Sequence, residues 1–292
     1  KTKEGLVRMC ACRGTSGFAH VSCLAEQAKI LLDEAEYNNL GVNVINKRWL
    51  RWGECSLCKQ EYHGLVACAL GWACWKTYVG RPEADACRKS AMNQLGKGLN
   101  DAGHDGYALI VKEAELAIHR RLGAPESHLL TVQANLACTL DELGRYEEAL
   151  PMKRDVHSGH ARLFGEEASI TLISANNYAS CLVKLKRFEE AKSLLRKTMP
   201  VARRVLGDND ENTLRLRCSY AKALYRDPTA TLDDLHEAVE THEDLERIAL
   251  RVFGGAHPAT EMIQGSLRES RAALSTRSVC EAMAAMTPPG DA

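Results

Sequence analysis

The 292-residue chain lacks a net charge, a long apolar run and an evident catalytic arrangement. Lys plus Arg and Asp plus Glu number 38 each, so no global field draws the protein to nucleic acid or to an anionic membrane. The longest apolar run, at 64–75, is too short to span a bilayer, and no leader-like segment starts the chain. No Ser/His/Asp arrangement, phosphate loop or carboxylate pair stands out. We therefore expect a cytoplasmic protein that recognises partners locally.

Cysteine and tryptophan are concentrated near the N-terminus. Eight of the 12 Cys precede residue 90 and all four Trp precede residue 85, whereas Ala, Leu, Glu, Lys and Arg follow with helical periodicity. A disulfide scaffold is typical of small secreted chains, which this one does not resemble in size. The sequence therefore predicts two parts that meet near residue 85, with metal binding favoured for the cysteines of the first.

The second part is a repeat array. "GRYEEALPMKRDVHSGHARLFG" begins at Gly144, and "KRFEEAKSLLRKTMPVARRVLG" begins 42 positions later at Lys186. Leu-Gly or Phe-Gly pairs recur in the same register at 122–123, 164–165, 206–207 and 253–254. The last unit carries a five-residue insertion around 227–235, which belongs in a loop.

Each period contains two helical segments. The first segments, 129–143 and 169–185, carry a small residue where a second helix must pack closely, Ala137 and Ala179. The second segments begin at "YEEA" or "FEEA", whose Glu pair is favoured by the positive end of the helix dipole, and they end at a Gly suited to a left-handed cap. Two second segments contain a proline, which predicts a kink or a shifted start there. These prolines are Pro151 and Pro200.

These landmarks resemble the tetratricopeptide repeat, in particular the longer variety of the kinesin light chains. The likeness covers residues 86–275 and implies a mainly α fold, a right-handed α-solenoid of helix pairs whose concave groove binds a protein or peptide. In that family the Asn beside "LA" contacts the backbone of a bound peptide. That position matches Asn135 and Asn177, and is Ser219 in the next unit. The alternative is that these Asn side chains only bond neighbouring helices.

The first part has the spacing of a zinc module. The candidate ligands are Cys10, Cys12, His20, Cys23, Cys55 and Cys58. They fall into short C-x-C, H-x-x-C and C-x-x-C pairs, and each such pair can supply two ligands to a tetrahedral Zn²⁺ from a single turn. A redox C-x-x-C is one alternative, but it would be expected beside a βαβ pattern that the chain lacks. A cluster of buried thiols is the other alternative.

The series resembles the last six ligands of the variant RING finger, the C4HC3 type, and its spacing fits the plant homeodomain finger less well. The resemblance implies a small RING-like module with two interleaved structural zinc ions. One ion would be held by Cys10, Cys12, Cys55 and Cys58. The second site would be incomplete in this chain, with only His20 and Cys23 present. We expect the missing C-x-x-C upstream of residue 1; otherwise His63, Cys68, Cys74 or Cys87 would have to replace it.

RING-type domains act as ubiquitin ligases by holding a conjugating enzyme, so the resemblance implies a docking face rather than a catalytic residue. On this sequence the face would comprise Leu57, Lys59 and either Trp49 or Trp52. Trp is a suitable anchor because it buries a large rigid area. The alternative for both Trp residues is core packing against the zinc loops.

The sequence thus predicts four segments: a variant RING module at 1–61, a helical connector at 62–85, a tetratricopeptide array at 86–275 and a flexible tail at 276–292. We expect an adaptor, or a ubiquitin ligase in which the array selects a protein and the zinc module recruits the conjugating enzyme. The alternative is a non-enzymatic scaffold with a purely structural zinc finger.

Overall fold

The computed structural model describes residues 4–7, 18–255 and 257–286, so Cys10 and Cys12 lie outside the described residues. The chain divides into two compact units, residues 1–144 and 145–292. This division falls after Gly144 and not near residue 85, where the composition changes. The cysteine-rich segment and the first helices of the array therefore belong to one folded unit.

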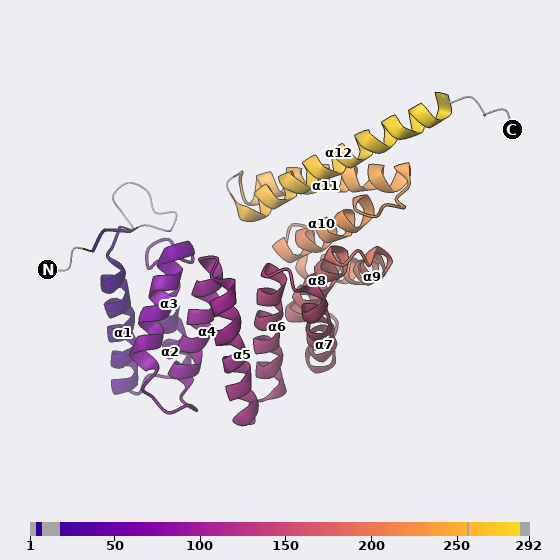
Figure 1. The fold of residues 1–292 in the computed structure, drawn as a ribbon. Coiled ribbons are helices and arrows are strands. Elements are labelled where there is room, and N and C mark those ends of the chain that lie inside the picture. The colour runs from indigo at the N-terminus through magenta and orange to yellow at the C-terminus, as the bar shows by residue number, and fades with distance from the viewer. Residues whose placement is uncertain (1–3, 8–17, 256, 287–292) are drawn as a thin grey trace. The chain divides into compact units, whose positions relative to one another are not determined.

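The described residues of the first unit are mainly helical. Its helices are α1 (Val21–Tyr37), α2 (Val42–Trp49), the short 3₁₀ helix η1 (Leu50–Trp52), α3 (Gly64–Tyr78), α4 (Ala86–Asp101), α5 (Asp105–Arg121) and α6 (Glu126–Glu142). Successive helices from α3 to α6 pack against one another and stand side by side in Figure 1. The apolar run at 64–75 lies in α3, where Val66, Leu70 and Cys74 are buried while Leu65 and Trp72 are exposed.

Helices α3 and α4 approach each other closely because each carries a glycine at the crossing. A Cβ atom added to Gly98 would lie 2.5 Å from the backbone oxygen of Ala67. A Cβ added to Gly71 would lie 3.0 Å from the backbone oxygen of Gln94. The backbone of the helix in the predicted connector is thus packed directly against the first helix of the predicted array.

A core cluster ties α1, η1, α3 and α4 together. It contains Leu32, Trp52, Tyr78 and the thiols of Cys74 and Cys87. Burial raises the pKa of the Cys87 thiol to about 11 and raises the pKa of the Cys74 thiol further. These thiols act as small apolar side chains, and no group of three or more His, Cys, Asp or Glu among the described residues includes them.

The second unit consists of α7 (Tyr146–Phe164), α8 (Ser169–Lys184), α9 (Phe188–Leu206), α10 (Glu211–Tyr225), α11 (Leu232–Val252) and α12 (Pro258–Met286). The repeat landmarks predict the starts of α7 and α9 correctly, at Tyr146 and Phe188. Because both helices begin there, the shifted start expected from Pro151 and Pro200 is wrong, and both prolines lie inside continuous helices. Each proline lacks the backbone N–H that would donate a hydrogen bond to the carbonyl oxygen four residues earlier.

Glycines end α7 and α9, but not in the left-handed helical conformation expected. Gly165 has φ 85° and ψ 163°, and Gly207 has φ 89° and ψ 164°. That region of backbone space is essentially restricted to glycine. The repeated Gly therefore lets the chain turn from one helix of the array into the next.

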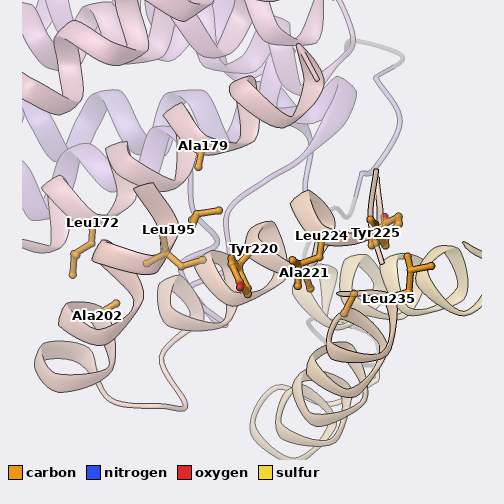
Figure 2. Close-up of a cluster of buried hydrophobic side chains, with 12 residues drawn as sticks. Leu172, Ala179, Leu195, Ala202, Tyr220, Ala221, Leu224, Tyr225 and Leu235 are labelled. Carbon is orange, nitrogen blue, oxygen red and sulfur yellow. The ribbon is translucent and has the colours of Figure 1, made fainter. Parts of the chain in front are cut away.

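The core of the second unit is built from leucines and small residues that interdigitate. Leu172 and Ala179 of α8 meet Leu195 of α9, while Leu224 of α10 lies near Leu235 of α11 (Figure 2). Ala179 is fully buried, as its place in the repeat predicts. Each buried leucine contributes about 1.5–3 kcal/mol of burial free energy, so this cluster is a main source of stability.

The C-terminal region departs from the sequence prediction. Helix α12 continues through Met286, so much of the predicted flexible tail at 276–292 is helical, which is compatible with the absence of Gly and Pro from residues 276–287. The insertion around 227–235 forms the loop between α10 and α11, except that its last residues begin α11. Thr231 caps that helix through a capping box with Asp234.

No helix in the described part of the chain combines the length and the apolar character that a bilayer span requires. That part also contains no β-strand beyond two isolated bridges, Val7 with Ala19 and Glu54 with Glu61.

Candidate functional site

A cavity of about 400 Å³ opens in the first unit between α4, α5 and α6. Helical spacing places pairs of polar side chains on its walls, because residues four apart share one face of a helix. Lys89 and Asn93 form such a pair on α4, and Glu115 and His119 form one on α5. Helix α6 contributes His128, Thr131 and Asn135, and Trp49 at the end of α2 completes the lining.

The cavity brings together two residues that the sequence assigns to different sites. Asn135 is predicted for the peptide groove and Trp49 for a conjugating-enzyme face, yet both line this cavity. The Asn135 carboxamide is half-buried and forms no hydrogen bond to a described residue. A carboxamide in this state can donate to and accept from the backbone of an incoming peptide.

Lys112 holds the backbone beside Asn135 in place. The Lys112 ammonium is buried and donates to the Asn135 carbonyl oxygen at 3.3 Å, to Thr139 Oγ1 at 2.7 Å and to the side chain of Asn100. Burial lowers the pKa of Lys112, and the neighbouring Glu115 partly opposes that effect. Because an ammonium has three donors, these three acceptors use all of them.

Glu115 is the most unusual side chain of the cavity. Only 3% of it is exposed, and its Oε2 atom has no hydrogen-bond partner among the described residues. Burial raises the pKa of Glu115 to about 7, against the opposing effects of a hydrogen bond from Asn93 and the charge of Lys112. Strongly shifted groups in cavities are typical of functional sites.

His119 stands one helical turn from Glu115 on the same wall and is also buried. Burial lowers the pKa of His119, and the charges of Lys89 and His128 lower it further. At neutral pH this imidazole is therefore held mostly in its uncharged form.

Asn177 lies in α8 of the second unit, half-buried, and its side chain makes no hydrogen bond to a described residue. The bond between neighbouring helices is made one position earlier, where Ser219 Oγ donates to Asn176 Oδ1 at 2.8 Å. A side-chain bond between neighbouring helices is thus present at Asn176. The groove role of Asn135 and Asn177 stays a prediction.

The described zinc candidates occupy two local turns. His20 caps α1, and its Nδ1 atom lies 3.7 Å from Sγ of Cys23 in the first turn of that helix. Cys55 and Cys58 lie on a tight hairpin in which the Cys55 N–H donates to the Gln60 carbonyl at 2.8 Å. Lys59 closes this hairpin with a positive φ of 62°. Val21 and Leu24 of α1 pack on the same apolar cluster as the hairpin.

Each of these turns presents the two ligands of its pair as a local unit, which is what a tetrahedral ion requires of paired ligands. No three His, Cys, Asp or Glu side chains within the described ranges gather around a common point. In the interleaved pattern the described residues would supply only two ligands to each ion, with Cys10 and Cys12 outside them. The donor set fits zinc in type and in local pairing.

The predicted docking residues differ in accessibility. The Leu57 side chain is 65% exposed at the tip of the hairpin, and Lys59 is exposed beside it. Trp52, in contrast, is only 1% exposed and packs edge-on against Tyr78 at a ring separation of 6.0 Å. Trp52 therefore cannot belong to a docking face, because it fills the core, and the core-packing alternative is correct for it.

Four residues of the cavity are not among the residues predicted from the sequence: Lys89, Asn93, Glu115 and His119. A signal was present on α5, where the buried stripe of Ala108, Leu109 and Leu116 is interrupted by charged or titratable residues at the same helical spacing. Polar residues on an otherwise apolar stripe require partners, and such residues mark a candidate site.

Two comparisons of the sequence bear on the array. Tetratricopeptide repeat family models match residues 129–167 and 170–227. These two segments of the chain carry tetratricopeptide repeats. No curated protein matches it in sequence. A tetratricopeptide array is a protein-interaction scaffold, and such repeats bind protein or peptide ligands.

Solved structures agree with this fold. A protein of Podosopora anserina, designated a kinesin light chain with nearly identical TPR-like repeats, superimposes with a TM-score of 0.51 at 18% identity, covering 80% of this chain and 97% of that one. BtubC (BKLC) from P. vanneervenii gives a TM-score of 0.50 at 14% identity, covering 94% and 96%. At these identities the likeness establishes the fold alone, a solenoid of tetratricopeptide type.

Proposed function

We propose that the repeat array binds an extended peptide and that Asn135 contacts the backbone of that peptide in the α4–α6 cavity. The supporting observation is an unbonded carboxamide on the wall of a cavity of about 400 Å³. A carboxamide pairs with peptide backbone regardless of side chains, because it donates and accepts together. Asn177 is proposed to do the same in the second unit.

The test begins with peptides selected from an unbiased display library on the full chain, followed by calorimetry on the selected peptides. Asn135→Ala is expected to weaken binding about tenfold, which corresponds to the loss of about 1.4 kcal/mol. Asn43→Ala, at an exposed position on α2, serves as the matched control and is expected to leave the affinity unchanged. If folded Asn135→Ala protein binds the selected peptides as the original chain does, the proposal fails.

A second proposal concerns the cysteine-rich segment: Cys55 and Cys58, together with Cys10 and Cys12, hold a structural zinc ion, and His20 and Cys23 hold part of a second site. It is supported by the two ligand turns and by their packing on one apolar cluster. Zinc would supply folding free energy there, about 10–16 kcal/mol in zinc-finger peptides. It would not activate a substrate, because a closed structural site has no open coordination position.

Elemental analysis of the full chain, purified without added chelator, tests this assignment. We expect bound zinc, and a loss of one equivalent in Cys58→Ser. Cys68→Ser is the control, because Cys68 is buried on α3 among apolar side chains and is expected to retain the metal. Metal-free protein, or equal metal in Cys58→Ser and the unchanged chain, contradicts the proposal.

We further propose that the zinc module gives the protein ubiquitin ligase activity. The exposed Leu57 and the neighbouring Lys59 offer an apolar contact and a charge to a ubiquitin-conjugating enzyme. In a ubiquitin chain assay with zinc-loaded full chain, Leu57→Ala is expected to reduce chain formation at least tenfold. Leu65→Ala, at a leucine on α3 that is also largely exposed, should not. No chains with any of a panel of conjugating enzymes would favour the non-enzymatic scaffold.

A further inference from the structure

Glu115 presents a buried acceptor that the protein itself does not satisfy. Its Oε2 atom lacks a partner in the described part of the chain, although the side chain is only 3% exposed. The Lys112 ammonium on the same helix donates its hydrogen bonds to Asn100, Asn135 and Thr139 instead. A buried hydrogen-bond acceptor without a partner typically costs about 1–3 kcal/mol of folding free energy, and more if it is charged.

The other charged and titratable groups around the cavity do not neutralise Glu115 either. They are Lys89 on α4, His119 on α5 and His128 on α6. The side chains that act on the Glu115 carboxyl are those of Asn93 and Lys112, and none of these three is among them. Lys89 is half-buried, and its long stem allows the ammonium to reach water at the rim.

We propose that this cavity receives a basic side chain of the bound peptide, an arginine or a lysine, whose N–H groups donate to Oε2 of Glu115. The inference rests on the proposed peptide-binding function and specifies the chemistry of the ligand. An acidic side chain is disfavoured, because a second carboxylate beside Glu115 would require one of the two to bind a proton. An apolar side chain would leave the Oε2 atom unsatisfied.

The rim of the cavity suits the same ligand. Trp49 lines it with an indole ring that is partly exposed and held against Tyr78 at a ring separation of 5.6 Å. A cation near the face of a tryptophan gains further attraction from the ring. The carboxamide of Asn93 on the α4 wall supplies an acceptor for the remaining N–H groups of a guanidinium.

Binding of a basic side chain should depend on pH in a defined direction. Since the pKa of Glu115 is about 7, the carboxyl is mostly protonated at pH 6 and mostly ionised at pH 8. Burial lowers the pKa of His119, which faces the same cavity, below its ordinary value, so its imidazole does not oppose this trend. We expect the affinity for an arginine-containing peptide to rise about tenfold between pH 6 and pH 8.

The experiment uses peptides selected on the full chain and compares each with a version in which its arginine is replaced by citrulline, a neutral isostere. We expect one position of the selected peptides to be enriched in arginine or lysine, and citrulline there to lower the affinity about tenfold. Glu115→Gln should remove this difference between the two peptides. Glu113→Gln, on the exposed face of the same helix, should preserve it.

A second variant tests whether the ligand side chain is positively or negatively charged. Lys89→Ala is expected to strengthen binding of the arginine peptide about threefold, because it removes a like charge from the cavity; weaker binding would indicate an anionic ligand and overturn the proposal. Circular dichroism of each variant establishes that it is folded.

The outcomes also separate this inference from the proposed function. Asn135→Ala should weaken the arginine and citrulline peptides equally, whereas Glu115→Gln acts only on the basic one. If selected peptides depend on Asn135 but show neither basic enrichment nor a citrulline effect, the peptide groove stands and the basic-side-chain pocket is wrong. If no peptide depends on Asn135, both proposals fall.

Discussion

The Nζ atom of Lys192 lies 3.0 Å from Oδ2 of Asp227, which joins α9 to the loop that carries the inserted residues. Both side chains are almost fully buried. Thr229 donates to the other oxygen of Asp227 from its backbone N–H at 2.9 Å and from its hydroxyl at 2.7 Å. The insertion is thus held by a satisfied ionic network and is an integral part of the second unit.

Asp227→Asn should destabilise the second unit by about 2 kcal/mol. Removing one partner of a buried pair typically costs about 3–5 kcal/mol, but Lys192 keeps its second partner, Glu189. Although burial opposes it, the bonds from Thr229 and Lys192 lower the pKa of Asp227, so this stabilisation is present above the ordinary carboxyl pKa and is lost in more acidic solution. Asp208→Asn removes an exposed pair with Arg203 and should change stability by less than about 0.5 kcal/mol. Urea unfolding followed by circular dichroism measures both, and equal effects would contradict the assignment.

Gly98→Ala should destabilise the first unit by about 3 kcal/mol, because the new methyl group would lie 2.5 Å from the backbone oxygen of Ala67 and force α3 and α4 apart. Gly106→Ala provides the matched control. Gly106 lies in α5 with no atom within 4 Å of the added Cβ, so that substitution should stabilise the helix by up to about 1 kcal/mol. Tryptophan fluorescence during unfolding reports on this unit, since all four Trp lie in it. Similar shifts in the two variants would refute the tight crossing.

The first unit should lose stability as the pH rises. The folded-state pKa of Glu115, about 7, exceeds its ordinary value of 4.5. The folded chain therefore holds a proton that the unfolded chain releases, and stability falls between about pH 4.5 and pH 7 by about 3 kcal/mol. In Glu115→Gln this part of the decline should vanish, while Glu113→Gln should retain it. Urea midpoints from tryptophan fluorescence at a series of pH values provide the measurement, and an unchanged slope in Glu115→Gln would count against a buried carboxyl.

The second unit should respond to pH in the opposite sense through His242. This imidazole is fully buried between Cys218 and Ser270, and burial lowers its pKa to about 4. As the pH falls below about 6.5, His242 binds a proton in the unfolded chain but not in the folded chain. The contribution of His242 to the free energy of unfolding is therefore fully present above that pH and is lost as the pH drops toward 4. His242→Gln should flatten this decline, as measured by amide hydrogen exchange in α11. His236→Gln, at an exposed position of the same helix, should not.

The parts of the fold that the sequence predicts are those controlled by local, repeated interactions. The Glu pairs after Tyr146 and Phe188 and the closing glycines at 165 and 207 act within one turn of helix, so their spacing is enough to locate α7 and α9. The fully buried Ala179 follows from the same register. A helix end depends on few neighbouring residues, and its position can therefore be predicted from the sequence alone.

What the sequence does not predict depends on contacts between distant segments. The boundary at 85 follows a change in composition, but the packing of Gly98 on Ala67 crosses it. The burial of Trp52 depends on Tyr78, and the residues of the cavity become neighbours only when α4, α5 and α6 assemble. The zinc ligands remain a prediction from spacing, with Cys10 and Cys12 outside the described residues.

The glycine crossing of α3 and α4 also limits how this protein could be divided or recombined. A fragment starting at Ala86 would uncover a backbone furrow on α4 shaped for a single partner helix, and water would fill it poorly. Exchange of the cysteine-rich segment between related chains would succeed only if residues 64–101 travelled with it. The segment that must be kept intact is therefore the α3–α4 helix pair, and not the zinc-finger-like sequence that precedes it.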